Sequence, residues 1–163
     1  MKYSESQALI KVAAYCSKAE RAESDVLRKL SLWELQPDET QRIISRLKKE
    51  NYLNEDRFCR SFIKDKLLFN KWGRIKIVFE LKKKQISEQT ISRSFDEFES
   101  DAFDDSLLKV LTSKAKTTKG KDEYDKRNKL IRFALGRGYS YDQIQKCLPK
   151  ILKTNTDDEY YLE

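Results

Sequence analysis

Apolar residues recur at intervals of three and four along nearly the whole chain. Near its start, Leu9, Val12, Ala13 and Cys16 fall at i, i+3, i+4 and i+7, so they share one face of a helix. The preceding segment 4–7, Ser-Glu-Ser-Gln, has the pattern of a capping box, in which two side chains satisfy the first free amides of a helix. Because the same spacing continues toward the far end, the sequence predicts an all-α protein.

Capping and turn residues divide this pattern into nine predicted helices. Serine, asparagine and proline favour helix starts, whereas glycine interrupts a helix. The predicted starts lie at Ser4, Ser24, Pro37 and Asn54, just after Gly73, and at Ser87 and Ser140. A seventh helix is expected to end in the polar stretch 112–125, which adds a mobile connection, and an eighth carries Leu130, Ile131 and Ala134.

The fifth predicted helix is expected to belong to the core. Trp72, Ile75 and Phe79 fall at i, i+3 and i+7, which predicts that they face inward. Val78 and Leu81 are expected to lie beside them.

Two segments of the chain resemble each other. FELKKKQISEQTI (79–91) and FALGRGYSYDQI (133–144) share a phenylalanine, a basic element, a serine and a closing isoleucine, and residues 30–44 resemble them weakly. The period of about 50 residues predicts three stacked units of three helices each, since one such unit has only a marginal core. The predicted units are 1–52, 53–99 and 100–153, followed by an acidic tail, 154–163, that is expected to be flexible.

Composition narrows the class of protein. Four glycines and two prolines in 163 residues are few for a parallel sheet or a barrel. No apolar run reaches the roughly 20 residues that cross a bilayer, and the first residues lack the apolar region of a signal peptide. Cys16, Cys59 and Cys147 lie among apolar residues, so we expect buried, reduced thiols in a cytoplasmic protein with no membrane partner.

Residue types for catalysis are sparse. Histidine, the usual general base and the commonest metal ligand, is absent. A phosphate-binding loop needs several glycines, and Trp72-Gly73-Arg74 supplies one. The pairs Asp104-Asp105 and Asp157-Asp158 are expected to be solvated acids. We therefore expect a protein that is not an enzyme and uses no metal or cofactor.

Charge is arranged in blocks along the chain, whose formal net charge is +7. Residues 57–84 carry 10 cations against two acids, residues 85–105 carry one cation against seven acids, and residues 106–137 carry 10 cations against three acids. The first block predicts a surface for an anionic partner. Its candidate residues are Arg57, Arg60, Lys64, Lys71, Arg74, Lys76, Lys82, Lys83 and Lys84.

The lysine triplet 82–84 has two interpretations. Cations in the last turn of a helix are favoured by the helix dipole, which alone could account for the triplet. The cations close by in sequence favour partner binding instead.

Four stretches carry a resemblance to a known family: AERAESDVLRKL (19–30), LKKENYLNEDRFCRSFIKDKL (47–67), WGRIKIVFELKKKQIS (72–87) and RFALGRGYS (132–140). In this order they resemble the RecX family of bacterial regulators of the RecA recombinase. The resemblance implies three tandem three-helix repeats in an elongated, curved arrangement, without enzymatic activity. It also implies a DNA-repair and SOS regulator that binds RecA and the RecA–DNA filament and inhibits its ATPase, recombinase and co-protease activities. Direct binding to single- or double-stranded DNA is a further property of some family members.

The chain departs from the family pattern at one turn. The basic-Gly-apolar turn between second and third helices survives at Gly138, whereas Gln85 replaces this glycine in the second repeat and Glu34 stands near it in the first. A residue other than glycine costs about 1 kcal/mol there in the left-handed conformation, or it needs a different turn.

Two other functions stay open, a stand-alone helical nucleic-acid-binding module and an adaptor between proteins. We expect a monomer, since no heptad seam is present.

Overall fold

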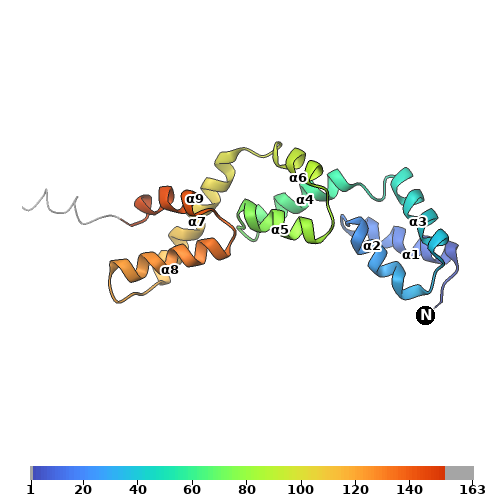
Figure 1. The fold of residues 1–163 in the computed structure, drawn as a ribbon, viewed down its shortest axis with the longest axis horizontal. Helices are drawn as coiled ribbons and strands as arrows, with labels where there is room; N and C mark the ends of the chain where they lie inside the picture. Colours follow the sequence, from blue (N-terminus) through green and yellow to red (C-terminus); the bar gives the residue numbers. More distant parts are fainter. Residues whose placement is uncertain (1, 153–163) are drawn as a thin grey trace, which may run out of the picture. The chain divides into compact units, whose positions relative to one another are not determined.

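A computed structural model describes residues 2–152, and in this range every regular element is helical (Figure 1). The α-helices are α1 (Glu5–Lys18), α2 (Glu23–Leu30), α3 (Pro37–Lys49), α4 (Glu55–Leu68), α5 (Arg74–Lys83), α6 (Glu88–Phe95), α7 (Ser100–Thr117), α8 (Glu123–Gly136) and α9 (Tyr141–Cys147). Two 3-10 turns, Ser31–Trp33 and Leu148–Lys150, follow α2 and α9. The predicted all-α class is confirmed. The tail 154–163 lies outside the described residues.

Most of the helices start where capping predicts. Ser4 and Ser140 form complete capping boxes, and Ser87 Oγ accepts a hydrogen bond from the Thr90 amide. Pro37 is the first residue of α3. The expected cap at Ser24 is wrong, because the N-cap residue of α2 is Ala22, two residues earlier. The Asp25 carboxylate accepts a hydrogen bond from the Ala22 amide there.

Helix α5 buries a different face from the one predicted. Ile77 and Leu81 are fully buried, whereas Ile75 is 59% and Phe79 is 61% exposed. Trp72 is only partly buried. A shift of two residues along a helix turns the side chain by about 200°, so burial of the Ile77–Leu81 face leaves Ile75 and Phe79 outside. The inward positions predicted for Ile75 and Phe79 are therefore wrong, and the one predicted for Leu81 is right.

The chain forms two compact units, Met1–Ile63 with Glu80–Glu97, and Lys64–Phe79 with Phe98–Glu163. The core of the first unit includes Val12, Val26, Ile43 and Leu47. The core of the second unit includes Leu107, Leu111, Leu130 and Ile144. The boundary runs through α4 and α5, so the middle three-helix segment contributes residues to both units. The repeat boundaries read from the sequence stay predictions.

The turns at the repeat positions are left-handed whether or not they contain glycine. Gly138 has φ of 97°, Gln85 has φ of 65° and Glu34 has φ of 56°. At Gln85 the backbone amide donates to the Lys82 carbonyl at 2.9 Å, which closes the end of α5. The three turns therefore share one backbone geometry. At Gln85 and Glu34 this geometry is sterically strained, because both residues have a Cβ atom in the left-handed region.

Two glycines bring backbone segments together within the second unit. A Cβ atom on Gly73 would lie 2.4 Å from the Gly138 carbonyl oxygen, and one on Gly138 would lie 2.4 Å from the Cβ of Lys76. The Gly73 amide donates to the Arg137 carbonyl at 2.7 Å, and the Ile75 amide donates to the Gly138 carbonyl at 3.1 Å. Gly73 thus joins the start of α5 to the turn after α8.

All three cysteines are free and buried, as the sequence predicts. In the part of the chain from residue 2 to residue 152, no helix has both the length and the apolar character needed to cross a membrane.

Candidate partner-binding surface

The nine candidate cations fall into two groups according to their neighbours. Arg57 and Arg60 lie in the first unit and are held by carboxylates, the former by Glu20 and the latter by Glu97 at 3.4 Å. The Arg57 guanidinium also donates to the Asn51 carbonyl at 2.9 Å. The side chain of Arg57 thus ties the entry to α4 to the segment before α2.

Each lysine of the triplet has a carboxylate partner. Lys82 Nζ lies 3.0 Å from Glu88 and Lys83 Nζ lies 3.3 Å from Glu80. Lys84 Nζ lies 2.8 Å from Asp25 on α2, in a largely buried pair. The three pairs place a carboxylate beside each lysine within the first unit. Both interpretations of the triplet stay predictions.

In the second unit, the candidate Lys76 and the neighbouring Lys66 lie over the ring of Trp72. The ammonium groups of Lys66 and Lys76 lie 4.7 Å and 4.6 Å from the centroid of the indole ring. Lys71 Nζ donates to the Leu68 carbonyl at 2.7 Å, while the Lys64 side chain is exposed. A cation over an aromatic face gains about 0.5–1 kcal/mol at an exposed site, so the ring fixes where these charges point. We call Lys66, Trp72 and Lys76 the Trp72 cluster.

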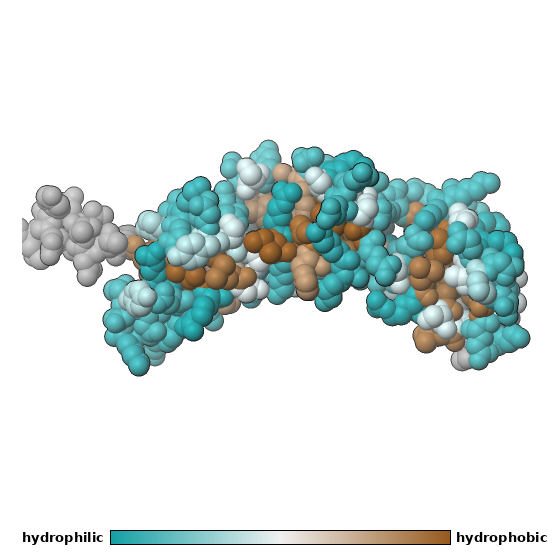
Figure 2. All heavy atoms as spheres, viewed as in Figure 1, coloured by the Kyte–Doolittle hydropathy of each residue, from teal (hydrophilic) through white to brown (hydrophobic). Residues whose placement is uncertain are grey.

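Large apolar side chains reach the surface beside this cluster. Ile75 and Phe79 lie one turn apart on α5, directly after the exposed Arg74, and Figure 2 shows apolar atoms at the surface over this helix. Phe69, at the end of α4, is 80% exposed. A group of exposed apolar residues next to cations is typical of a surface that contacts another macromolecule.

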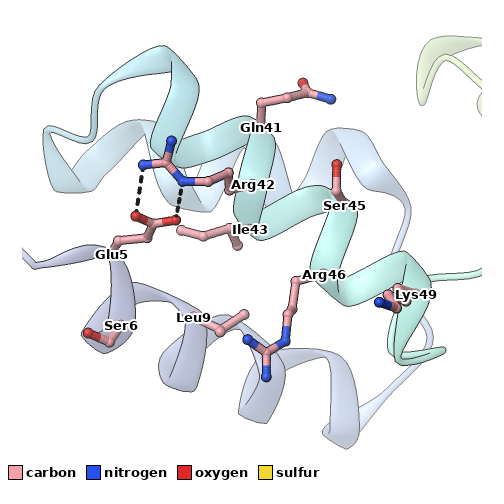
Figure 3. A pocket seen from close by; sticks show the side chains of 9 residues that line it. All are labelled: Glu5, Ser6, Leu9, Gln41, Arg42, Ile43, Ser45, Arg46 and Lys49. Atoms are coloured by element: carbon pink, nitrogen blue, oxygen red, sulfur yellow. Dashed lines mark hydrogen bonds and ion pairs between the residues drawn. The ribbon is translucent and has the colours of Figure 1, made fainter.

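A hollow of about 560 Å³ lies between α1 and α3 in the first unit (Figure 3). The Arg42 guanidinium holds the Glu5 carboxylate through bonds of 2.8 Å and 2.9 Å and also donates to Asp38 at 3.1 Å. Hydrogen bonds from Arg42 lower the pKa of both carboxyl groups below their usual range. Arg46 is paired with Glu50 at 2.8 Å. The arginines of this hollow are therefore already occupied by acids.

Within residues 2–152, no group of three Cys, Asp or Glu side chains gathers as metal ligands would. The charged groups of the described surface are ammonium, guanidinium and carboxylate groups. Such an arrangement can bind charged macromolecules.

Models of three-helix domains match two parts of the chain. The second three-helix domain of RecX matches residues 54–94, and the third matches residues 103–148. The Regulatory protein RecX of Clostridium perfringens strain 13 is 31% identical over 145 residues, which cover 88% of this chain and 66% of the relative. The chain belongs to the RecX family.

Further RecX relatives give the same result. The Regulatory protein RecX of Clostridium botulinum strain Eklund 17B is 33% identical over 136 residues, which cover 81% of this chain and 62% of the relative. The chain thus spans slightly less than two thirds of the length of these RecX proteins. The crystal structure of RecX from Lactobacillus salivarius matches with a TM-score of 0.80 at 20% identity over 90% of this chain and 96% of that one. This likeness supports the helical-repeat fold.

The candidate list missed cations of the second unit. Lys66 was not among the candidates although it lies over Trp72. Lys109, Lys114 and Arg137 line a second hollow near Lys71. The sequence signal for Lys109, Lys114 and Arg137 is the second basic block, 106–137, whose segment 109–121 holds five lysines and no acid.

Proposed function

We propose that this protein binds RecA and the RecA–DNA filament and lowers the recombinase, ATPase and co-protease activities of RecA. As a regulator of DNA repair and of the SOS response it would act in the cytoplasm, as a monomer. The observation that carries the proposal is the match of two successive three-helix segments to the RecX family of regulatory proteins.

The surface of α5 supports contact with a protein. Ile75 and Phe79 stand on one exposed face of the helix, and Arg74 precedes them at its first turn. Apolar side chains surrounded by cations suit a partner surface with apolar residues and carboxylates, since the apolar contact contributes affinity and the charges contribute orientation. The Trp72 cluster adds positive charge in the same unit.

Titration of the DNA-dependent ATPase of RecA tests the proposal. The protein is added in increasing amounts to RecA on single-stranded DNA, and the steady rate of ATP hydrolysis is followed. We expect inhibition well below one protein per RecA, because blocking one filament end affects many protomers. An unchanged rate at equimolar protein would contradict the proposed function.

Paired variants locate the contact surface. Ile75→Ser with Phe79→Ser removes the exposed apolar pair, and we expect at least about a tenfold rise in the concentration for half inhibition, which corresponds to about 1.4 kcal/mol. Lys82→Gln with Lys83→Gln is the matched control on the same helix, since both lysines already pair with acids, and we expect less than about a twofold change. Equal effects of the two variants would place the contact elsewhere.

A stand-alone nucleic-acid-binding module is the second candidate function, favoured by the two basic blocks. It would bind DNA with the same affinity whether or not RecA is present. Its affinity would fall steeply with salt, because bound cations release counterions from the phosphates.

A further inference from the structure

A second hollow, of about 330 Å³, lies in the second unit along α7 and α8, and we call it the α7–α8 hollow. No carboxylate lines it, and its four cations are Lys71, Lys109, Lys114 and Arg137. Lys109 and Lys114 come from α7, Arg137 directly follows α8, and Lys71 precedes α5. Three separate segments of the chain thus bring positive charge to one place.

None of these four cations pairs with an acid among residues 2–152. Lys71 Nζ donates to the Leu68 carbonyl at 2.7 Å, and an Arg137 Nη donates to the Asn70 carbonyl at 2.7 Å. Both contacts use neutral acceptors and leave the positive charge unbalanced. The arginines of the hollow between α1 and α3 differ, because each of them is held by an acid.

An aromatic ring orders two of the cations. Lys114 Nζ lies 4.8 Å and Arg137 Cζ lies 5.2 Å from the centroid of the Phe133 ring. A cation held against a ring loses less freedom when a ligand binds. Arg137 is fixed further by its bond to the Asn70 carbonyl, so the hollow is organised before any ligand arrives.

The hollow also offers apolar surface. Val110 and Phe133 line it, and both are only partly buried although they pack against the core of the second unit. A small anion would leave this apolar surface in water, whereas an acidic segment that also carries apolar side chains would cover it. The lining therefore suits an acidic peptide with aromatic or aliphatic groups.

One such segment belongs to this chain. Residues 154–163 carry four acids and no cation. Within this segment, two tyrosines and a leucine at 160–162 directly follow the three acids at 157–159. The opposite charges of segment and hollow favour their association, and the tyrosines and the leucine supply the apolar groups.

The chain is long enough to bring this segment to the hollow. Ile151 and Leu152, the last described residues, pack against the same core as Val110 and Phe133. An extended chain spans about 3.3–3.6 Å per residue, so residues 157–163 reach about 17–38 Å from Leu152. A compact unit of about 80 residues has a radius of gyration of only about 12 Å. Groups joined by a short linker meet at an effective concentration on the order of millimolar, so even a weak contact forms.

We propose that the acidic segment 157–163 binds in the α7–α8 hollow of the same chain and keeps the hollow closed to other anions. Its carboxylates balance the charge of Lys109, Lys114 and Arg137, and its apolar side chains cover Val110 and Phe133. Any other anionic ligand of the hollow must displace the segment first. The contact requires neither RecA nor nucleic acid, so it goes beyond the proposed function.

Carbodiimide crosslinking of the full chain, followed by mass spectrometry, tests the contact without any partner. The reagent joins a carboxylate directly to a lysine when the two are in contact. We expect the acids 157–159 to be joined to Lys109 and Lys114 at least about fivefold more often than to Lys119 and Lys121, because a bound segment stays beside the hollow. Lys119 and Lys121 are exposed in the same lysine run and do not line the hollow, so they report on a segment that is not bound.

Salt and a single substitution test whether charge holds the segment. The excess of links should vanish between about 0.1 M and about 1 M salt, because the Debye length falls from about 10 Å to about 3 Å. In Lys109→Gln we expect links to Lys114 to fall about threefold, since one ion pair is lost. Lys119→Gln is the matched control with the same change of charge, and we expect links to Lys114 to stay within about 1.5-fold of the parent. Equal losses in both variants would reduce the effect to net charge and overturn the proposal.

The distribution of the links can overturn the proposal in two ways. Equal frequencies at Lys109, Lys114, Lys119 and Lys121 would show a segment that is not bound. Links concentrated on Lys66 and Lys76 would place the segment at the Trp72 cluster instead.

Crosslinking of an equal mixture of unlabelled and ¹⁵N-labelled protein distinguishes contacts within one chain from contacts between copies. We expect links only between peptides that carry the same label. Mixed pairs at the same frequency as like pairs would assign the contact to a second copy, and the proposal would fail.

Discussion

At the scale of single residues, Gln85 holds a backbone conformation that glycine adopts without cost. Its φ of 65° places it in the left-handed region, and its side chain is exposed. We expect Gln85→Gly to raise the free energy of unfolding by about 0.5 kcal/mol, because relief of the Cβ clash exceeds the entropy that glycine adds to the unfolded chain. The melting temperature should rise by roughly 1–2 °C, measured by circular dichroism.

Gln41→Gly is the control for this substitution. Gln41 is exposed in the interior of α3, so the same change should lower stability by about 1 kcal/mol. If both variants were destabilised alike, the turn at Gln85 would not be left-handed in solution.

The three thiols give a prediction on pH. Burial raises the pKa of Cys16, Cys59 and Cys147 above the ordinary value of 9.0. The unfolded state therefore loses these protons first as the pH rises, and the stability that the protonated thiols contribute below pH 9.0 is lost above it. We expect the free energy of unfolding, measured by urea titration in reductant, to fall as the pH passes upward through this range.

Substitution of all three cysteines by alanine should flatten that part of the pH profile, although it lowers stability at every pH. Burial raises the pKa of Tyr139, so its own titration at higher pH would remain. Rapid reaction of the native thiols with a disulfide reagent at neutral pH would contradict their burial.

At the scale of elements, the docking of α5 depends on the absence of a side chain at Gly73. An added methyl group would lie 2.4 Å from the Gly138 carbonyl oxygen, which is backbone and cannot rotate away. We expect Gly73→Ala to lower the free energy of unfolding by about 2–3 kcal/mol, because the hydrogen bonds from Gly73 and Ile75 must lengthen. Thermal melting measures the loss.

Gly136→Ala is the matched control two residues from Gly138. No atom lies within 4 Å of the added methyl group, and Gly136 is the last residue of α8. This variant should be neutral or up to about 1 kcal/mol more stable. A loss of stability as large as that of Gly73→Ala would mean that the close contact is not the cause.

Helix starts could be predicted from the sequence because their determinants are local. Ser87 and Thr90, like Ser140 and Gln143, interact over three residues. The buried face of α5 could not be predicted, because it follows from the contact of Gly73 with Gly138, which lies 65 positions away in the sequence. The sequence pattern alone also favoured Ile75 and Phe79 as core residues, and both side chains are exposed in the structure.

The positive charge of the candidate site could be predicted from the sequence, but the carboxylate partners of its cations could not. Counting cations identified the basic blocks, yet Arg57 is held by Glu20 and Lys84 by Asp25, at sequence separations of 37 and 59 residues. Such pairs balance charge that a local count assigns to a free surface. The hollow lined by Lys71, Lys109, Lys114 and Arg137 is formed by three segments of the chain, and no local sequence pattern in any one of them predicts it.

At the scale of the whole molecule, the two units predict how the chain opens. Leu130→Ala leaves a cavity in the core of the second unit and should lower the free energy of unfolding by about 3 kcal/mol. We expect hydrogen exchange to accelerate together in residues 75–79 and in α7 to α9, because residues 64–79 belong to that unit. Mass spectrometry of peptides after exchange measures the change.

Ile43→Ala is the counterpart in the core of the first unit. Exchange should then accelerate in α1 to α3 and in residues 80–97, with residues 75–79 protected as before. Two outcomes would contradict the division into two cooperative units. One is faster exchange of residues 75–79 in the Ile43→Ala variant, and the other is an equal acceleration of exchange at all amides in either variant. The curved arrangement implied by the resemblance stays a prediction for scattering in solution.

The contact between Gly73 and Gly138 also sets a rule for chimaeras within the family. A chimaera with its crossover at residues 99–100 takes position 73 from one parent and position 138 from the other. The backbones at these two positions are so close that a Cβ atom on Gly73 would lie 2.4 Å from the Gly138 carbonyl oxygen. We expect parents that both have glycine at these two positions to exchange the segment after residue 99 without loss of stability. For a parent with a larger residue at either position, we expect the exchanged segment not to fit a foreign α5, because an added Cβ atom would clash with backbone.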